Sequence, residues 1–190
     1  MPAPLLNKDE MLDRLLATLR DKGYDGASLA DLSAATGLAK SSLYHSFPGG
    51  KEEIALQVLQ HLDAKLARAL FEPLRSKRPP ARKLAAMLAT IDEHYDGGRA
   101  ASLLGRLGAS ADRLAFRRAL GHAFGVWLDA VEALCLEAGL PGAVARARAE
   151  DLVVRLEGAL VVAAGTGDPA VFARTLGALR RSLLAPPTAD

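Results

Sequence analysis

The spacing of apolar residues constrains the fold of this chain more than any other feature. Alanine, leucine, arginine and glutamate recur at intervals of three and four along the chain, and no alternation of β-branched residues lasts beyond a few positions. Intervals of three and four place side chains on one face of an α-helix, whereas a half-buried strand requires strict alternation. The spacing therefore predicts an all-α fold of about nine helices.

Caps and helix breakers set the expected boundaries. Asn7 is the expected N-cap of the first helix, Glu10 would close a capping box with it, and Gly23 would end the helix. Later helices are separated by glycine and proline, beginning with Gly37. The expected helices span 8–22, 29–36, 40–47, 51–71, 80–95, 99–107, 112–138, 142–164 and 169–184.

Composition excludes several classes of protein. The chain has 190 residues, a single cysteine (Cys135) and a formal net charge of +2. One cysteine excludes an internal disulfide and a multi-cysteine zinc site, and it fits a reducing compartment. We expect a cytoplasmic protein with no membrane span, because no apolar run approaches the roughly 18 residues that a span requires and no signal-peptide pattern opens the chain. The small net charge does not by itself predict nucleic-acid binding.

Residues 28–51 carry the most informative motif, two short helices joined by a tight turn. Ser33 provides a small side chain where the helices would touch, and Gly37 provides a residue that tolerates a positive φ at the turn. The apolar residues that would lock the pair together are Leu29, Leu32, Leu38, Leu43 and Phe47. This arrangement predicts a helix-turn-helix.

The second helix of the motif keeps polar residues off its apolar face. These residues are Lys40, Ser41, Ser42, Tyr44 and His45. Side chains of this kind reach base edges and phosphates when a helix lies in the major groove. Residues 40–47 are therefore the predicted recognition helix, and double-stranded DNA is the predicted partner.

The motif also resembles a known family. The sequence from Gly37 to Phe47, followed by Gly50, Lys51, Glu52 and Glu53, resembles the signature of TetR-type transcriptional regulators. Further segments at 48–51 and 155–160 resemble the subgroup typified by the LmrA and YxaF repressors of multidrug resistance. The resemblance implies an N-terminal three-helix DNA-binding domain followed by a C-terminal helical ligand-binding and dimerisation domain. It also implies a repressor of an efflux or detoxification gene that a small lipophilic inducer releases from DNA.

The resemblance further implies roles for individual residues. Ser28 would contact a phosphate from the start of helix 29–36. The residues that would meet base edges or the nearby backbone are Lys40, Ser41 and Ser42. The residues that would clamp phosphates are Tyr44, His45 and Lys51.

Two positions depart from the family pattern. Ala39 stands where many members have a serine or threonine cap, and Ser33 stands where alanine is usual. Loss of an N-cap costs a helix about 1 kcal/mol. Because one hydroxyl is also missing from the DNA face, the operator sequence cannot be carried over from relatives.

The domain prediction follows from these motifs. We expect a helix-turn-helix DNA-binding domain at 1–51 and a ligand-binding and dimerisation domain at 52–190, with helix 51–71 connecting them. The basic, proline-bearing stretch at 75–83 could be a nucleic-acid or membrane patch. We interpret it as a solvated connection, because it follows the end of helix 51–71 that is remote from Lys51.

The last two helices predict a dimer. The helix at 142–164 is apolar on nearly all sides, with valines at 153, 154, 161 and 162 behind its leucine face, so it needs two burial partners. A symmetry mate is the economical second partner, and the alternative is a helix buried wholly in one subunit. The predicted interface residues are Leu152, Leu156, Ala159, Leu160, Ala163, Phe172, Leu176, Leu179 and Leu183. A two-fold dimer implies a palindromic operator.

The sequence indicates the residues of a ligand site less clearly than those of the DNA-binding motif. Apolar and aromatic residues of the C-terminal domain could line a pocket, although most such residues form core. The predicted lining residues are Met87, Ile91, Tyr95, Leu104, His122, Phe124, Trp127 and Leu128. We expect no cofactor and no metal, because no carboxylate lies at ligand spacing from the histidines.

Two other classes of function compete with DNA binding. An enzyme could use His94 or His122 as an acid–base group, but no nucleophile elbow, phosphate loop or pair of histidines at i and i+4 supports it. We therefore expect no enzymatic activity. A helical protein–protein interaction module without DNA binding stays open as the alternative to a regulator.

Overall fold

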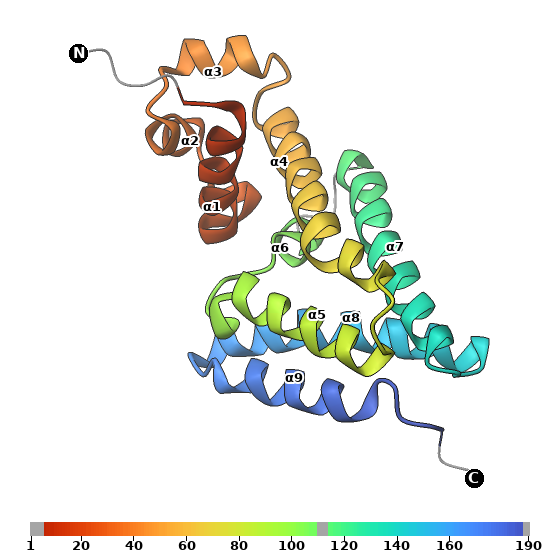
Figure 1. Cartoon of the computed structure of the whole chain (residues 1–190). Helices are drawn as coiled ribbons and strands as arrows, with labels where there is room; N and C mark the ends of the chain where they lie inside the picture. Colours follow the sequence, from red (N-terminus) through yellow and green to blue (C-terminus); the bar gives the residue numbers. More distant parts are fainter. Residues whose placement is uncertain (1–5, 110–113, 188–190) are drawn as a thin grey trace. The chain divides into compact units, whose positions relative to one another are not determined.

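The architecture is built from helices throughout the part of the chain described here, residues 6–109 and 114–187 of a computed structural model (Figure 1). The α-helices are α1 (Lys8–Gly26), α2 (Leu29–Thr36), α3 (Lys40–Ser46), α4 (Gly50–Leu66), α5 (Pro80–His94), α6 (Leu103–Ala109), α7 (Leu114–Glu137), α8 (Gly142–Thr166) and α9 (Ala170–Ser182). A π-helical turn, η1 (Ala67–Phe71), and a 3-10 turn, η2 (Glu72–Arg75), follow α4, and a second 3-10 turn, η3 (Asp96–Gly98), follows α5. The all-α prediction is confirmed.

Two helix boundaries lie more than two residues from their predicted positions, and a third predicted end is a kink within a helix. The helix expected at 99–107 begins only at Leu103, because the chain first turns through η3, where Gly97 and Gly98 have φ values of 60° and 90°. The helix expected to end at Phe71 stops being an α-helix at Leu66 and continues as η1 and η2. Helix α1 consists of two helical segments that meet at a kink at Gly23, whose φ of 71° is the positive value predicted for the end of the first helix.

The chain divides into two compact units. Unit 1 comprises Met1–Lys65 and Leu103–Leu120, and unit 2 comprises Leu66–Ser102 and Gly121–Asp190. Unit 1 thus combines the helix-turn-helix with α6 and the start of α7. Its interior includes the edge-to-face pair Tyr24 and Phe116, whose ring centroids lie 4.9 Å apart.

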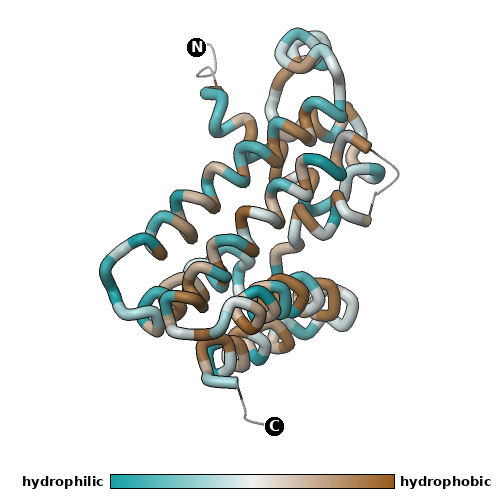
Figure 2. Tube along the Cα trace, turned by 90° about the vertical axis from the view of Figure 1, so that its right-hand side faces the viewer, coloured by the Kyte–Doolittle hydropathy of each residue, from teal (hydrophilic) through white to brown (hydrophobic). Residues whose placement is uncertain are grey.

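Unit 2 is a helical stack in which α9 packs against both α8 and α5 (Figure 1). Apolar positions recur along its helices (brown in Figure 2), and Phe172 of α9 is fully buried. The Phe172 ring lies 5.8 Å from that of Tyr95, which joins α9 to the end of α5. Helix α9 therefore buries its apolar face against its neighbours in this stack.

Helix α7 is unusually apolar. Its residues Phe116–Glu137 form the one helix among the described residues that is long and apolar enough, by length and composition, to cross a membrane. The sequence prediction overlooked it because polar residues interrupt its apolar runs. Within unit 2, its residues Trp127, Val131 and Cys135 are buried, as in the core helix of a bundle.

Substitution of Gly98 tests the turn that displaces α6 from its predicted start. A Cβ atom at Gly98 would lie 2.5 Å from Phe172 Cβ, and the φ of 90° disfavours any L residue. We therefore expect Gly98→Ala to lower the free energy of unfolding by about 2–4 kcal/mol, as measured by urea denaturation.

Gly125→Ala is the matched control for this prediction. Gly125 lies within α7, and a Cβ atom there would meet nothing within 4 Å. Alanine in place of a helical glycine should raise the free energy of unfolding by roughly 0.5–1 kcal/mol. Equal effects of the two substitutions would contradict the close packing of Gly98.

Candidate nucleic-acid interface

The turn between α2 and α3 is fixed by one glycine and one serine. Gly37 caps α2 in the left-handed conformation, with a φ of 70°, as the sequence predicted. Ser33 Oγ donates a hydrogen bond of 2.5 Å to the carbonyl oxygen of Leu38, across the turn. The serine that departs from the family pattern therefore braces the turn, a role the sequence did not reveal.

Helix α3 is held by its apolar face alone. Within it only Leu43 is buried, and Phe47, the residue that follows, is 1% exposed. Ala39 precedes the helix without a side-chain cap, as the sequence predicted. Because α3 has seven residues and no cap, its position depends on burial of Leu43 and Phe47.

The remaining side chains of α3 are open to solvent. Those predicted to contact DNA are all exposed: Lys40, Ser41, Ser42, Tyr44 and His45. Tyr44 is the most conspicuous of them, because half of a large aromatic side chain faces solvent. One helix thus presents a cation, hydroxyl groups and an aromatic ring together, a combination suited to base edges and phosphates.

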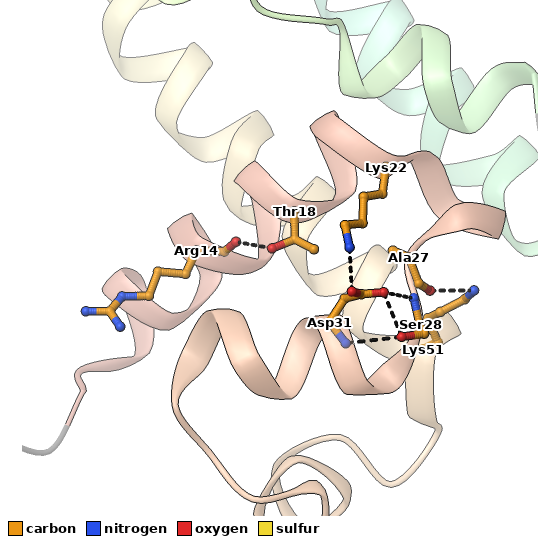
Figure 3. A network of polar contacts seen from close by, with 7 residues as sticks. All are labelled: Arg14, Thr18, Lys22, Ala27, Ser28, Asp31 and Lys51. Atoms are coloured by element: carbon orange, nitrogen blue, oxygen red, sulfur yellow. Dashed lines mark hydrogen bonds and ion pairs between the residues drawn. The ribbon is translucent and has the colours of Figure 1, made fainter.

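Ser28 belongs to a polar network at the start of α2 (Figure 3). The Asp31 carboxylate accepts hydrogen bonds from the Ser28 backbone N–H (2.8 Å) and hydroxyl (2.6 Å), and Ser28 Oγ accepts one from the Asp31 N–H (3.1 Å). Lys22 forms an ion pair with the same carboxylate. Hydrogen bonds from Lys22 and Ser28 hold the pKa of Asp31 well below its usual range. A phosphate at this helix start would compete with Asp31 for the Ser28 hydroxyl.

Lys51 is partly engaged within unit 1. Its Nζ donates a hydrogen bond of 2.9 Å to the Ala27 carbonyl oxygen and lies 4.5 Å from the centroid of the Tyr24 ring. An ammonium group carries three donors, so donors remain for a phosphate. Lys51 therefore also ties the start of α4 to the end of α1.

A second polar cluster joins α4 to α1. The Asp13 carboxylate lies 2.9 Å from His61 Nε2 and 2.7 Å from Lys65 Nζ. Burial raises the pKa of Asp13, but the hydrogen bonds from Lys65 and His61 outweigh burial and leave the pKa lowered. The sequence did not predict this cluster, because its residues lie far apart in the chain and each has the composition of an ordinary helix surface.

The residues predicted for the dimer interface share one environment in the structure. All nine are buried inside a single chain, by the packing of α8 and α9: Leu152, Leu156, Ala159, Leu160, Ala163, Phe172, Leu176, Leu179 and Leu183. They have little surface left for a second copy. The face of α8 that one chain leaves open carries Val154, Val161 and Val162, which are 70%, 67% and 47% exposed.

The residues predicted to line a ligand pocket fall into three groups. The buried ones are Met87, Ile91, Tyr95, Leu104 and Trp127; Phe124 and Leu128 are half-buried, and His122 is exposed. Leu104 belongs to unit 1 and the other seven to unit 2. A cavity of about 370 Å³ within unit 2 is lined by none of these residues. Among the described residues no group of three or more His, Cys, Asp or Glu could hold a metal ion.

Comparison with known proteins identifies the helix-turn-helix. Residues 7–58 match the N-terminal sequence model described as bacterial regulatory proteins of the tetR family. The chain belongs to the TetR family of transcriptional regulators. The repressor DhaR of Mycobacterium sp. strain GP1 is 28% identical over 149 residues, which cover 77% of this chain and 74% of DhaR. The regulator LmrA of Bacillus subtilis is 25% identical over 85 residues, and that match spans only 45% of either protein.

Solved structures of TetR-family regulators share the fold of this chain. A TetR regulator from Legionella pneumophila superposes with a TM-score of 0.84 at 17% identity and covers 95% of this chain and 99% of its own. A regulatory protein TetR from Rhodobacter sphaeroides superposes with a TM-score of 0.77 at 25% identity, covering 91% and 94%. The helix-turn-helix of this TetR-family chain is therefore its DNA-binding element.

The lowered pKa values predict acid sensitivity of unit 1. A carboxylate with a lowered pKa stabilises the fold above the ordinary aspartate pKa of 3.8, and this stability is lost as the pH falls through that value toward the lowered one. Urea unfolding midpoints of the wild type should therefore fall between about pH 5 and pH 3. The unfolding midpoint of the Asp31→Asn variant should fall less steeply over this range, because one of the two carboxylates no longer contributes.

Glu52→Gln is the control for this pH series. It removes one exposed carboxylate of α4 that takes no part in either cluster. Its unfolding midpoints should follow those of the wild type from pH 7 to pH 3. A pH dependence of Asp31→Asn that matches the wild type would contradict the stabilising role of the Asp31 network.

Proposed function

We propose that this TetR-family regulator is a ligand-responsive repressor that binds a palindromic operator as a homodimer and leaves it when a small lipophilic molecule binds. The observation that carries the proposal is the exposed polar face of α3, from Lys40 to His45, on a helix that Leu43 and Phe47 anchor in a TetR-type DNA-binding domain. The named relative DhaR is a repressor, which supports repression over activation. The relatives of this chain are bacterial transcriptional regulators. We therefore place the protein in the cytoplasm and assign it no enzymatic activity.

The residues of α3 would divide the work of DNA binding. Lys40, Ser41 and Ser42 stand in the first turn of the helix, where a recognition helix meets base edges. Tyr44 and His45 would contact phosphates. Lys51 would add a phosphate contact through the donors that Ala27 and Tyr24 leave free. The number of cations is small, so we expect a shallow salt dependence.

The second copy of the chain would pack on the valine face of α8. Val154, Val161 and Val162 leave an apolar stripe open to solvent. Gly158 lies between Val154 and Val161 with no atom outside its own helix near its missing Cβ, which permits close approach of a partner helix. A two-fold axis at this face would present two α3 helices to half-sites about one helical turn of DNA apart.

Release from DNA would use the helical run that begins with α4. This run starts at Gly50, next to Lys51, in unit 1 and continues without a break through η1 and η2 in unit 2. A ligand in unit 2 can weaken operator binding only if it binds more tightly to an arrangement of the two DNA-binding domains that does not fit the operator. A coupling free energy of about 1–3 kcal/mol would weaken operator binding roughly 5- to 150-fold.

A gel shift with the DNA upstream of its own gene tests the proposal. We expect the wild type to retard one specific fragment and the double variant Lys40→Ala, Tyr44→Ala to lose at least about tenfold in affinity, because base and phosphate contacts are removed together. Lys77→Ala is the matched control, since it removes an exposed cation outside α3.

The gel shift also distinguishes the alternative function. If the double variant and the wild type bind every fragment alike, or bind none while both stay folded by circular dichroism, the repressor assignment is wrong. The protein–protein interaction module would then be the better interpretation of the helix-turn-helix.

A charge on the valine face tests the dimer. The wild type should elute with a light-scattering mass of about twice the 20.0 kDa of one chain, and Val161→Glu should give the monomer mass, because two carboxylates would face each other in the apolar interface. Leu136→Glu is the control, because Leu136 is a 48% exposed apolar residue of α7. A wild-type monomer, or a Val161→Glu dimer, would contradict the assignment of the valine face.

A further inference from the structure

Unit 2 contains a cavity that none of the residues predicted from the sequence lines. It measures about 370 Å³, which falls within the usual range for small-molecule sites. One wall comes from η1 and η2, and the other from residues 126–137 of α7. The cavity therefore lies between the continuation of α4 and helix α7.

The floor of the cavity is apolar and firmly held. Phe71, Leu74 and Leu134 line it, and each is at most 9% exposed. The π-helical turn buries Leu70 and Phe71 in succession. The Phe71 ring packs edge-to-face on Trp127 at 5.4 Å, so the floor does not depend on a ligand for its shape.

The two acids at the rim already have cationic partners. The Glu137 carboxylate accepts hydrogen bonds of 2.6 and 2.8 Å from Nζ of the buried Lys83. Asp129 pairs with Arg146 at 3.4 Å, although Arg146 also pairs with Glu132 and Glu150. Glu137 is therefore well compensated, and Asp129 is compensated in part.

Arg75 is a cation at the rim that has no such partner among the described residues. It is exposed, it lines the cavity, and no ion pair or hydrogen bond of its side chain occurs among residues 6–109 and 114–187. Lys77, Arg78 and Arg82 follow in the same basic stretch and are also exposed. A guanidinium group offers a planar fork of donors that matches carboxylate and phosphate oxygens.

We propose that this cavity binds an amphipathic anion, with the apolar body on the floor of Phe71, Leu74 and Leu134 and a carboxylate or phosphate group on Arg75. The apolar walls favour an apolar ligand body, and the Arg75 guanidinium, which has no side-chain partner among the described residues, favours an anionic end. Ligand binding is inferred from the cavity and its charged residues alone. The effect of the ligand on DNA binding rests on the proposed function. A ligand there touches the helical run that begins with α4, and under the proposed function its binding would weaken operator binding.

The single tryptophan of the chain reports on the site. Trp127 is 4% exposed and packs on Phe71, so a ligand on the floor should change its fluorescence. The probes are decanoate, decyl phosphate, decanol and decyltrimethylammonium, each below its micelle concentration. We expect the two anions to bind at least about tenfold more tightly than decanol, because each gains a charge-assisted hydrogen bond. The stronger of the two anions identifies the head group.

Substitutions in and near the cavity test whether the ligand contacts Arg75 and the apolar floor. Arg75→Gln should weaken decanoate binding about tenfold, to the level of decanol, while decanol binding stays unchanged. Arg82→Gln, which removes a neighbouring cation that does not line the cavity, should bind decanoate like the wild type. Ala130→Phe, which fills the cavity, should abolish binding of all probes, and Arg75→Gln keeps the test valid if Ala130→Phe fails to fold.

Three results would overturn the inference. They are equal affinity for all four head groups, tighter binding of the cationic probe through Asp129, and decanoate binding that Arg75→Gln does not change. Failure of the proposed function is separate, because it appears as absence of specific DNA retardation with no probe present. If decanoate releases the wild type and Arg82→Gln from DNA but does not release Arg75→Gln, the site takes part in regulation.

Discussion

Burial of Leu43 and Phe47 is the interaction on which the function of this protein depends. Helix α3 has seven residues and no side-chain cap, so it is too short to hold its shape alone. Leu43 and Phe47 anchor it, and the Ser33 hydroxyl braces the turn before it. Every other side chain of the helix is then exposed to solvent. A small part of the hydrophobic core thus decides the orientation of the whole recognition face.

The rest of unit 1 supports this face through polar contacts at helix ends. The Asp31 network fixes the start of α2, and Lys51 links the start of α4 to the end of α1. Asp13, His61 and Lys65 then hold α4 along α1. Helix α4 continues through η1 and η2 to Arg75 at the cavity. Under the proposed function, this continuous helical run would link a ligand in the cavity to the helix-turn-helix.

Local chemistry made much of this structure predictable from the sequence. The capping box of Asn7 and Glu10, the left-handed Gly37 and the exposed face of α3 each depend on residues a few positions apart. Features that depend on distant residues were not predictable in the same way. The start of α6 depends on contact between Gly98 and Phe172, and the two apolar faces of α8 could not be distinguished by composition. The cavity is lined partly by Phe71 of a π-helical turn that no sequence pattern marks.

Hydrogen–deuterium exchange of the full-length protein, with and without its upstream DNA, tests the central claim most directly. Binding through α3 predicts slower exchange of the amides in Lys40–Ser46 and at the start of α4, and no change in the basic stretch at 75–83. Protection confined to residues 75–83 would contradict the account, because the DNA would then lie on the cations of unit 2 and not on the recognition helix.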